Sequence, residues 1–325
     1  MIEALAVVVL PQFQEPPTRS VIATRSVIAT VTDVVKDACR DRRTEHFEGL
    51  MDALRSASGL EESAPGMWTA QVEQAVSYPT AGHVTTQQIE AESFWYAHRQ
   101  ACVLAAIGRH PPAGTIYDIG GGIGTLALAL REAGYSAVVV EPLASGAKVA
   151  WDRGARPVVN ATTRAASFAT SSLPAVGLFD VVEHVPDHER FMEHIHDLLV
   201  PGGRAYITVP AFEWLWSQDD VEAGHHRRYN VDALSSLLTN AGFDVEYSTY
   251  LFRPLPLPIL AVRVVGGRLG RRDPAADGVA ARDHLTTRGW PAAVLSRMLR
   301  PEVRAVDGGR RMSVGSSILM VAHKS

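Results

Sequence analysis

The segment Asp118–Thr125, which reads DIGGGIGT, decides the fold prediction. It overlaps the end of the short apolar run Thr115–Ile119 and leads directly into a leucine-rich stretch that stops near Gly134. This order predicts a strand, a glycine turn and a helix. Glycines let a ligand approach the backbone closely, and the N-terminus of a helix favours an anionic group. We therefore expect a ligand-binding loop at this position.

Strands and helices alternate along the chain after this loop. Apolar runs predict further strands at 137–140, 157–159, 176–179, 205–209, 243–250 and 314–321, with helical stretches between most of them. This alternation is typical of a mostly parallel sheet that helices cover on both faces. The predicted fold class is therefore α/β, a Rossmann-like sheet of seven strands.

Two regions lie outside this alternating pattern. Residues 1–85 are expected to form a variable N-terminal extension that is partly helical, at 31–38 and 46–57, and residues 86–325 the α/β domain. Residues 252–312 form an insert before the last strand and hold 12 arginines against five acidic residues. We interpret it as a capping subdomain with solvated arginines; the alternative is a surface for anionic lipid or an acidic substrate.

Composition excludes several classes of protein. A net charge of −4 over 325 residues argues against a nucleic-acid-binding protein, and two cysteines cannot form a disulfide framework. No apolar run reaches the ~18 residues that a membrane-spanning helix needs. The start of the chain is a poor signal peptide, because no basic residue precedes its apolar stretch. We expect a cytoplasmic protein, with peripheral membrane contact left open.

The glycine loop is compatible with two cofactors. Gly122, Gly124 and Ala127 fit the dinucleotide pattern G-x-G-x-x-A, and Glu141 lies where a ribose-binding acid is expected, which allows a nicotinamide-dependent oxidoreductase. However, Asp118 would repel a pyrophosphate and suits the ammonium group of an amino acid. Glu141 offers two acceptor oxygens to the two hydroxyls of a ribose. An amino acid joined to adenosine, without phosphate, describes S-adenosylmethionine (SAM).

Over residues 94–322 the sequence resembles the class I SAM-dependent methyltransferases, in particular the branch of ubiquinone-type O-methyltransferases and their bacterial relatives. The glycine loop matches the first motif of this family, and Glu141 matches its acid after the second strand. Residues 177–187 (GLFDVVEHVPD) look like the family segment after the fourth strand, and residues 209–217 and 224–229 resemble a narrower branch. The resemblance implies an antiparallel last strand, inserted between the fifth and sixth strands of the sheet.

The expected cofactor-binding residues combine the chemistry of the loop with this resemblance. They are Asp118, Gly120, Gly121, Gly122, Gly124, Glu141, Pro142, Asn160, Ala161 and Phe179. Asn160 and Ala161 stand about where the family has an acid that contacts adenine, so the sequence departs from the family pattern there.

Methyl transfer to a hydroxyl requires a base close to the methyl group. Ligands of open α/β sheets lie beyond the carboxyl ends of the strands, where the candidate catalytic residues His184, His225 and Asp180 are expected. Asp180, Glu183 and His184, with His225 nearby, are also candidate ligands of a divalent metal ion. Some ubiquinone-type relatives have a similar acid-x-x-Glu-His arrangement that is associated with a metal.

The sequence thus predicts a SAM-dependent methyltransferase of bacterial small-molecule metabolism. We expect its acceptor to be a small molecule or a lipid-linked compound, methylated at a hydroxyl, and we expect no nucleic-acid partner. The alternatives are a nicotinamide-dependent oxidoreductase and a non-catalytic protein that keeps the cofactor-binding fold as a scaffold.

Overall fold

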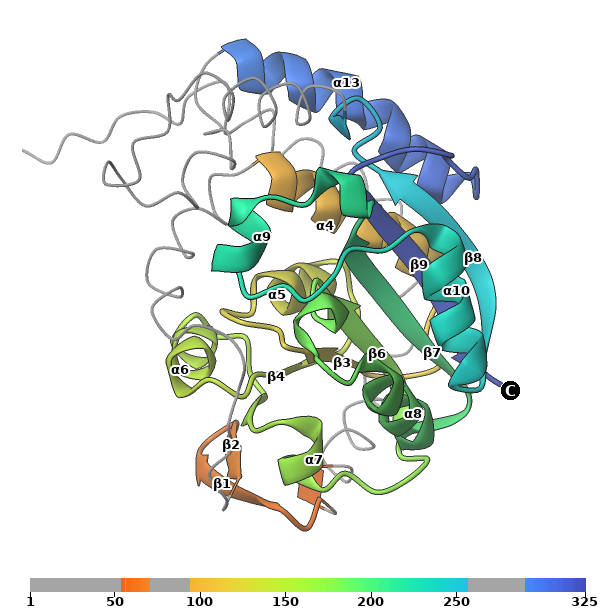
Figure 1. Cartoon of the computed structure of the whole chain (residues 1–325). Helices are drawn as coiled ribbons and strands as arrows, with labels where there is room; N and C mark the ends of the chain where they lie inside the picture. The colour runs from red at the N-terminus through yellow and green to blue at the C-terminus, as the bar shows by residue number, and fades with distance from the viewer. Residues whose placement is uncertain (1–53, 56, 71–93, 257–289) are drawn as a thin grey trace, which may run out of the picture.

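The computed structural model describes residues 54–55, 57–70, 94–256 and 290–325 (Figure 1). Its centre is a nine-stranded sheet in the order β1-β2-β5-β4-β3-β6-β7-β9-β8. The strands are β1 (Leu60–Ala64), β2 (Met67–Ala70), β3 (Ile116–Ile119), β4 (Ala137–Val140), β5 (Val158–Asn160), β6 (Leu173–Phe179), β7 (Leu199–Pro210), β8 (Phe243–Leu251) and β9 (Ser317–Lys324).

The sheet is mostly parallel, as the sequence predicts. All neighbouring pairs from β2 to β7 are parallel. The last strand, β9, is antiparallel to both β7 and β8 and lies between them. The prediction of an antiparallel last strand between the fifth and sixth strands is therefore confirmed.

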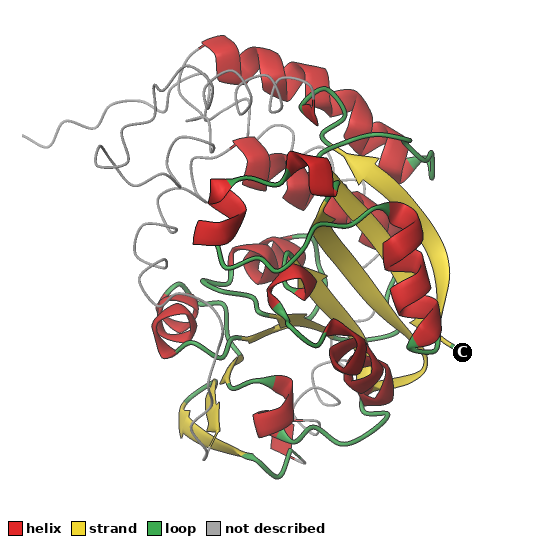
Figure 2. Cartoon of the chain, viewed as in Figure 1, coloured by secondary structure: helices red, strands yellow, loops and turns green. Residues whose placement is uncertain are grey.

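Helices lie on both faces of the sheet (Figure 2). They are α4 (Phe94–Arg109), α5 (Thr125–Glu132), α6 (Ala144–Asp152), α7 (Thr163–Ala166), α8 (His188–Leu198), α9 (Gln218–Glu222), α10 (Val231–Asn240) and α13 (Trp290–Asp307), with short 3-10 turns η2 (Val182–His184) and η3 (Glu213–Leu215). Among the described residues, no helix is both long enough and apolar enough to cross a bilayer.

The core consists of two buried clusters, one on each face of the sheet. Alternate strand residues point to opposite faces, and Tyr117 belongs to the cluster that also holds Met192 of α8 and Leu234 of α10. Its neighbour Ile116 belongs to the other cluster, which holds α4, α5, α6 and part of α13, for example Leu104. Figure 1 shows α8 and α10 beside each other over one face. The result is a three-layer α/β/α arrangement.

Local sequence signals explain how two of the helices begin. Asn230 accepts a hydrogen bond from the backbone N–H of Ala233 at 2.7 Å, which caps α10. Asp187 accepts one from the N–H of Arg190 at 3.3 Å and caps α8. The two caps help to hold the connections after β6 and β7 in place.

The structure adds two strands that the sequence analysis did not predict. Residues 60–70 form the hairpin β1–β2, whose turn lies at Pro65 and Gly66, and β2 pairs with β5. The sheet therefore has nine strands instead of seven. The helix expected at 31–38, and the part of the helix expected at 46–57 that precedes residue 54, lie outside the described residues, as does 257–289 of the expected insert. Helix α13 forms the last part of that insert.

Candidate active site

The glycine loop connects β3 to α5 at the carboxyl edge of the sheet. Gly120, Gly122 and Gly124 have φ of +69°, +53° and +74°, a region that residues with a Cβ rarely adopt. A Cβ on Gly120 would lie 2.8 Å from Cγ2 of Val181, so this glycine also permits close contact with the segment after β6. A Cβ on Gly122 would meet nothing within 4 Å. The loop is therefore packed on one side and open at Gly122.

Glu141 follows β4 and holds the neighbouring loops together. Its carboxylate accepts hydrogen bonds from the backbone N–H groups of Gly122 and Leu143, both at 2.8 Å. Burial raises the pKa of Glu141 to about 7, although the two backbone hydrogen bonds oppose the shift. The side chain is thus close to the open face of the loop and near its ionisation point at neutral pH.

Asn160 ends β5 beside this carboxylate. Its side-chain amide donates to the carbonyl oxygens of Glu141 and Pro142 at 2.9 and 3.0 Å. Ala161, the next residue, is buried. Asn160 therefore fixes the backbone that carries Glu141. The residue at which the sequence departs from the family pattern thus has a role in positioning Glu141.

Two further predicted cofactor residues are buried. A Cβ on Gly121 would lie 2.9 Å from Oδ2 of Asp118, so the carboxylate lies directly against the loop. Phe179 ends β6, and its ring packs over Gly177, where a side chain would clash with it. Phe179 belongs to the same buried cluster as Cys102 of α4.

Asp180 follows β6 in a left-handed conformation, with φ of +58°. Its carboxylate pairs with Arg99 of α4 and accepts a hydrogen bond from Oγ1 of Thr208 at 2.9 Å. Both oxygens are thus engaged. This network joins α4 to the carboxyl ends of β6 and β7.

Three side chains converge next to this network. One carboxylate oxygen of Glu183 and one ring nitrogen each of His184 and His225 lie within 4.8 Å of one another. The two imidazole rings meet edge to face, 4.7 Å between centroids. The sequence groups Asp180, Glu183 and His184, with His225 nearby, as candidate metal ligands. The structure places Glu183, His184 and His225 together and leaves Asp180 with Arg99 and Thr208.

Burial sets the charge state of two members of this cluster. Glu183 is fully buried, and neither of its carboxylate oxygens has a hydrogen-bond partner in the described part of the chain. Burial raises its pKa to about 8. Burial, together with the nearby His225, lowers the pKa of His184 to about 4. His184 is therefore neutral at neutral pH and a weak base.

His225 has a carboxylate partner that the sequence analysis did not assign to the site. Its Nδ1 lies 2.8 Å from Oδ1 of Asp220, which is 1% exposed. Nε of Arg228 donates to the same oxygen at 2.8 Å. In the sequence, this pairing is indicated only by the short spacing of five residues between Asp220 and His225.

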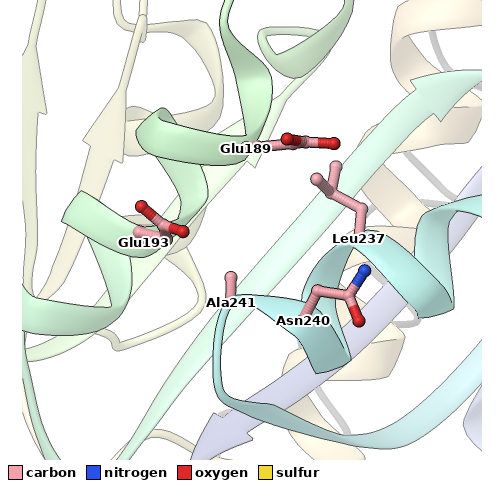
Figure 3. A pocket seen from close by; sticks show the side chains of 5 residues that line it. All are labelled: Glu189, Glu193, Leu237, Asn240 and Ala241. Carbon is pink, nitrogen blue, oxygen red and sulfur yellow. The ribbon is translucent and has the colours of Figure 1, made fainter.

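A shallow hollow lies elsewhere on the molecule, between α8 and α10 (Figure 3). It is lined by Glu189, Glu193, Leu237, Asn240 and Ala241. None of these residues belongs to the glycine loop or to the histidine cluster. Its two carboxylates and small size make it unsuited to the cofactor.

Comparison with known proteins identifies the class of the domain. Residues 96–248 match the family model of a methyltransferase domain, a range that includes the glycine loop, Glu141 and the histidine cluster. This range of the chain therefore carries a methyltransferase domain. A search of the curated proteins found no match.

Several solved methyltransferases are similar to this enzyme in fold. A SAM-dependent methyltransferase from Thermotoga maritima is 17% identical over 75% of this chain and 97% of its own, with a TM-score of 0.47. One from Archaeoglobus fulgidus is 16% identical over 74% of this chain and 99% of its own, at 0.45. Phosphoethanolamine N-methyltransferase 2 from Haemonchus contortus, in complex with SAM, is 19% identical over 76% of this chain and 58% of its own, at 0.49. The enzyme class rests on the family match.

Replacement of Gly122 tests the loop. In Gly122→Val the new side chain fills the open face where we expect the cofactor, so affinity for S-adenosylhomocysteine should fall about 100-fold or more, which is ~2.7 kcal/mol. Isothermal titration measures the change. Gly154→Val is the matched control, because Gly154 also has positive φ (+82°) and open space around it but lies outside the loop. Equal affinities of the two variants would contradict the assignment of the loop.

The raised pKa of Glu141 predicts a pH-dependent affinity for the cofactor. Near pH 7 the free methyltransferase holds a proton on part of its Glu141 carboxyls, whereas ribose hydroxyls donate best to the ionised form. Binding then releases a proton, and affinity for S-adenosylhomocysteine should rise up to ~10-fold from about pH 6 to about pH 8. Glu141→Gln should bind more weakly without this slope, whereas the exposed control Glu132→Gln should retain it. An affinity that is flat or falls with pH in the wild type would refute the role.

Proposed function

We propose that the enzyme transfers the methyl group of SAM to a hydroxyl of a small-molecule or lipid-linked acceptor, with His225 as the general base. The observation that supports it most is the cluster of Glu183, His184 and His225 beside the glycine loop. Val181 lies two residues before Glu183 in the chain and packs against Gly120 of the glycine loop. The cluster and the glycine loop are therefore neighbours. The methyl acceptor would enter between them.

His225 suits the role of base better than His184. The low pKa of His184, about 4, means that it cannot retain a proton at neutral pH. His225 is paired with a carboxylate, and its side chain remains 16% exposed, so an acceptor can reach it. An acceptor hydroxyl loses its proton as the new bond to carbon forms, and a histidine within hydrogen-bond reach can accept it.

Asp180 is proposed to act on the cofactor side of the site. Its pairing with Arg99 and Thr208 holds the backbone after β6, from which Val181 contacts the glycine loop. The proposed cofactor contacts at Asp118, Glu141 and the loop glycines lie on this same edge of the sheet. Asp180 thus connects the cofactor loop to the acceptor side.

Exposed apolar groups near His225 support a hydrophobic acceptor. The connection from β7 to α10 carries His225, and the same connection exposes Trp214 (50%) and Val221 (54%). Trp214 stacks on Phe212, 5.2 Å between ring centroids, which fixes its ring at the surface. A lipid-linked compound would find apolar contacts there that a fully polar acceptor would not use.

A divalent metal ion is the second candidate role for the same cluster. The buried Glu183 carboxylate favours it, because this carboxylate has no hydrogen-bond partner among the described residues and buried polar atoms are normally satisfied. Two histidines and one glutamate are also a known ligand set for zinc, with one position left open. An ion held there would polarise the acceptor oxygen, and His225 would then serve as a ligand instead of a base.

The reaction itself is tested with methyl-labelled SAM and a metabolite extract of the source cell from which the gene has been deleted. We expect one labelled product that is absent without enzyme, with the label on oxygen. Labelling on nitrogen or carbon would correct the acceptor atom. Cofactor binding without any labelled product would instead support the scaffold alternative.

His225→Ala should lower this turnover by ~100–10,000-fold, the range expected for the loss of an acid–base group. Affinity for S-adenosylhomocysteine should stay nearly unchanged, because the residue lies on the acceptor side. His226→Ala is the matched control, since the neighbouring histidine side chain is exposed. Unchanged turnover in His225→Ala would remove this residue from the mechanism.

A chelator separates the base from the metal ligand. If His225 is the base, turnover persists in EDTA and elemental analysis of the purified enzyme finds no stoichiometric metal, and this is the result that we expect. Loss of turnover in EDTA, restored by one divalent ion and absent in Glu183→Gln, would establish the metal role in its place.

A further inference from the structure

Asp220 is a buried residue in the connection between β7 and α10, and it accepts several hydrogen bonds. Its carboxylate accepts hydrogen bonds from Nε of Arg228 and from the backbone N–H of Ser217, both at 2.8 Å, besides its contact with Nδ1 of His225. The backbone N–H of His225 also donates to the carbonyl oxygen of Asp220 at 2.8 Å. His225 is therefore held to Asp220 through both its ring and its backbone.

The carboxylate of Asp220 forms an ion pair with Arg228, and the hydroxyl of Ser217 donates to its Oδ2 at 3.3 Å. Arg228 is itself fixed, since its NH1 donates to the carbonyl oxygen of Ala211 at 3.2 Å. The negative charge and the orientation of Asp220 are thus both determined by its surroundings.

An ionised carboxylate can only accept hydrogen bonds. The contact of 2.8 Å with Nδ1 therefore requires that Nδ1 of His225 carries a hydrogen. In the neutral imidazole one nitrogen is a donor and the other an acceptor, so the lone pair must be on Nε2. Nε2 is then the ring nitrogen that is left to accept a proton.

We infer that Asp220 is a positioning residue for methyl transfer: it fixes the tautomer and the orientation of His225 so that Nε2 is the proton acceptor. The inference rests on the proposed role of His225 as base. In the step, the acceptor oxygen forms a bond to the methyl carbon while the carbon–sulfur bond breaks and its electron pair goes to sulfur. The hydroxyl proton passes to Nε2, and Asp220 stabilises the imidazolium that results. The products are the methyl ether or ester and S-adenosylhomocysteine.

The tautomer can be measured directly. In the ¹⁵N-labelled full-length enzyme with S-adenosylhomocysteine added, at a pH where the ring is neutral, NMR should show Nδ1 of His225 protonated and Nε2 with a free lone pair. The signals are assigned by their loss in His225→Gln. A ring with the hydrogen on Nε2 would overturn the inference, whatever the activity of any variant.

Asp220→Ala gives the second test. Alanine removes the oxygen that accepts from both Nδ1 of His225 and Nε of Arg228. Nothing at position 220 then holds the hydrogen on Nδ1, so turnover with the deletion-strain extract should fall by ~100–10,000-fold. The same spectrum should show the tautomer change, a signature that a purely structural role would not produce. Asp232→Ala, the same substitution on the exposed surface of α10, should leave both turnover and spectrum unchanged.

The outcomes separate this inference from the proposed function. If His225→Ala retains turnover, the proposed base is wrong. If His225→Ala loses turnover but Asp220→Ala retains both turnover and the wild-type tautomer, the inference about Asp220 alone fails. Titration with S-adenosylhomocysteine reports whether Asp220→Ala is folded. If this variant does not fold, the tautomer measured in the wild-type enzyme decides the question.

Discussion

The close contact between Gly120 and Val181 is the constraint on which the rest of the site depends. It exists because the backbone of Gly120 is left-handed and because no side chain separates it from the segment after β6. Through this contact, the loop after β3 packs directly against the residues that follow β6. The histidine cluster therefore lies next to the loop that is proposed to hold the cofactor, and a shift of either loop would separate the methyl donor from its acceptor.

The sequence predicts the centre of the sheet well because each central strand is an uninterrupted apolar run between turn residues. Strand β4 has the predicted bounds, 137–140, since all four side chains are buried and Gly134 precedes them. The hairpin of residues 60–70 could not be predicted in this way. Its strands are short and half polar, and what makes them part of the sheet is the distant pairing of β2 with β5, which no local pattern encodes. The place of β9 came from the family resemblance.

In the candidate site, too, the sequence predicts some features and leaves others to tertiary contacts. Motifs select Glu183, His184 and His225, but they do not determine which carboxylate joins them. That choice depends on Arg99, which comes from α4 and draws Asp180 away, and on an irregular connection that turns Asp220 toward His225. Both depend on tertiary contacts over long sequence distances or on loop backbone without periodicity. Sequence spacing therefore gives the members of the cluster more reliably than their partners.

The position of β9 has a consequence for any shortened form of the protein. This strand lies between β7 and β8 and supplies hydrogen bonds to both, yet it is outside the matched range 96–248. A fragment cut to that range would lose the strand that connects β8 to the sheet, and the backbone of β7 would become an unprotected edge. Such a fragment would be expected to self-associate in expression trials, so the boundaries of a usable recombinant domain follow the order of the strands and not the extent of sequence similarity.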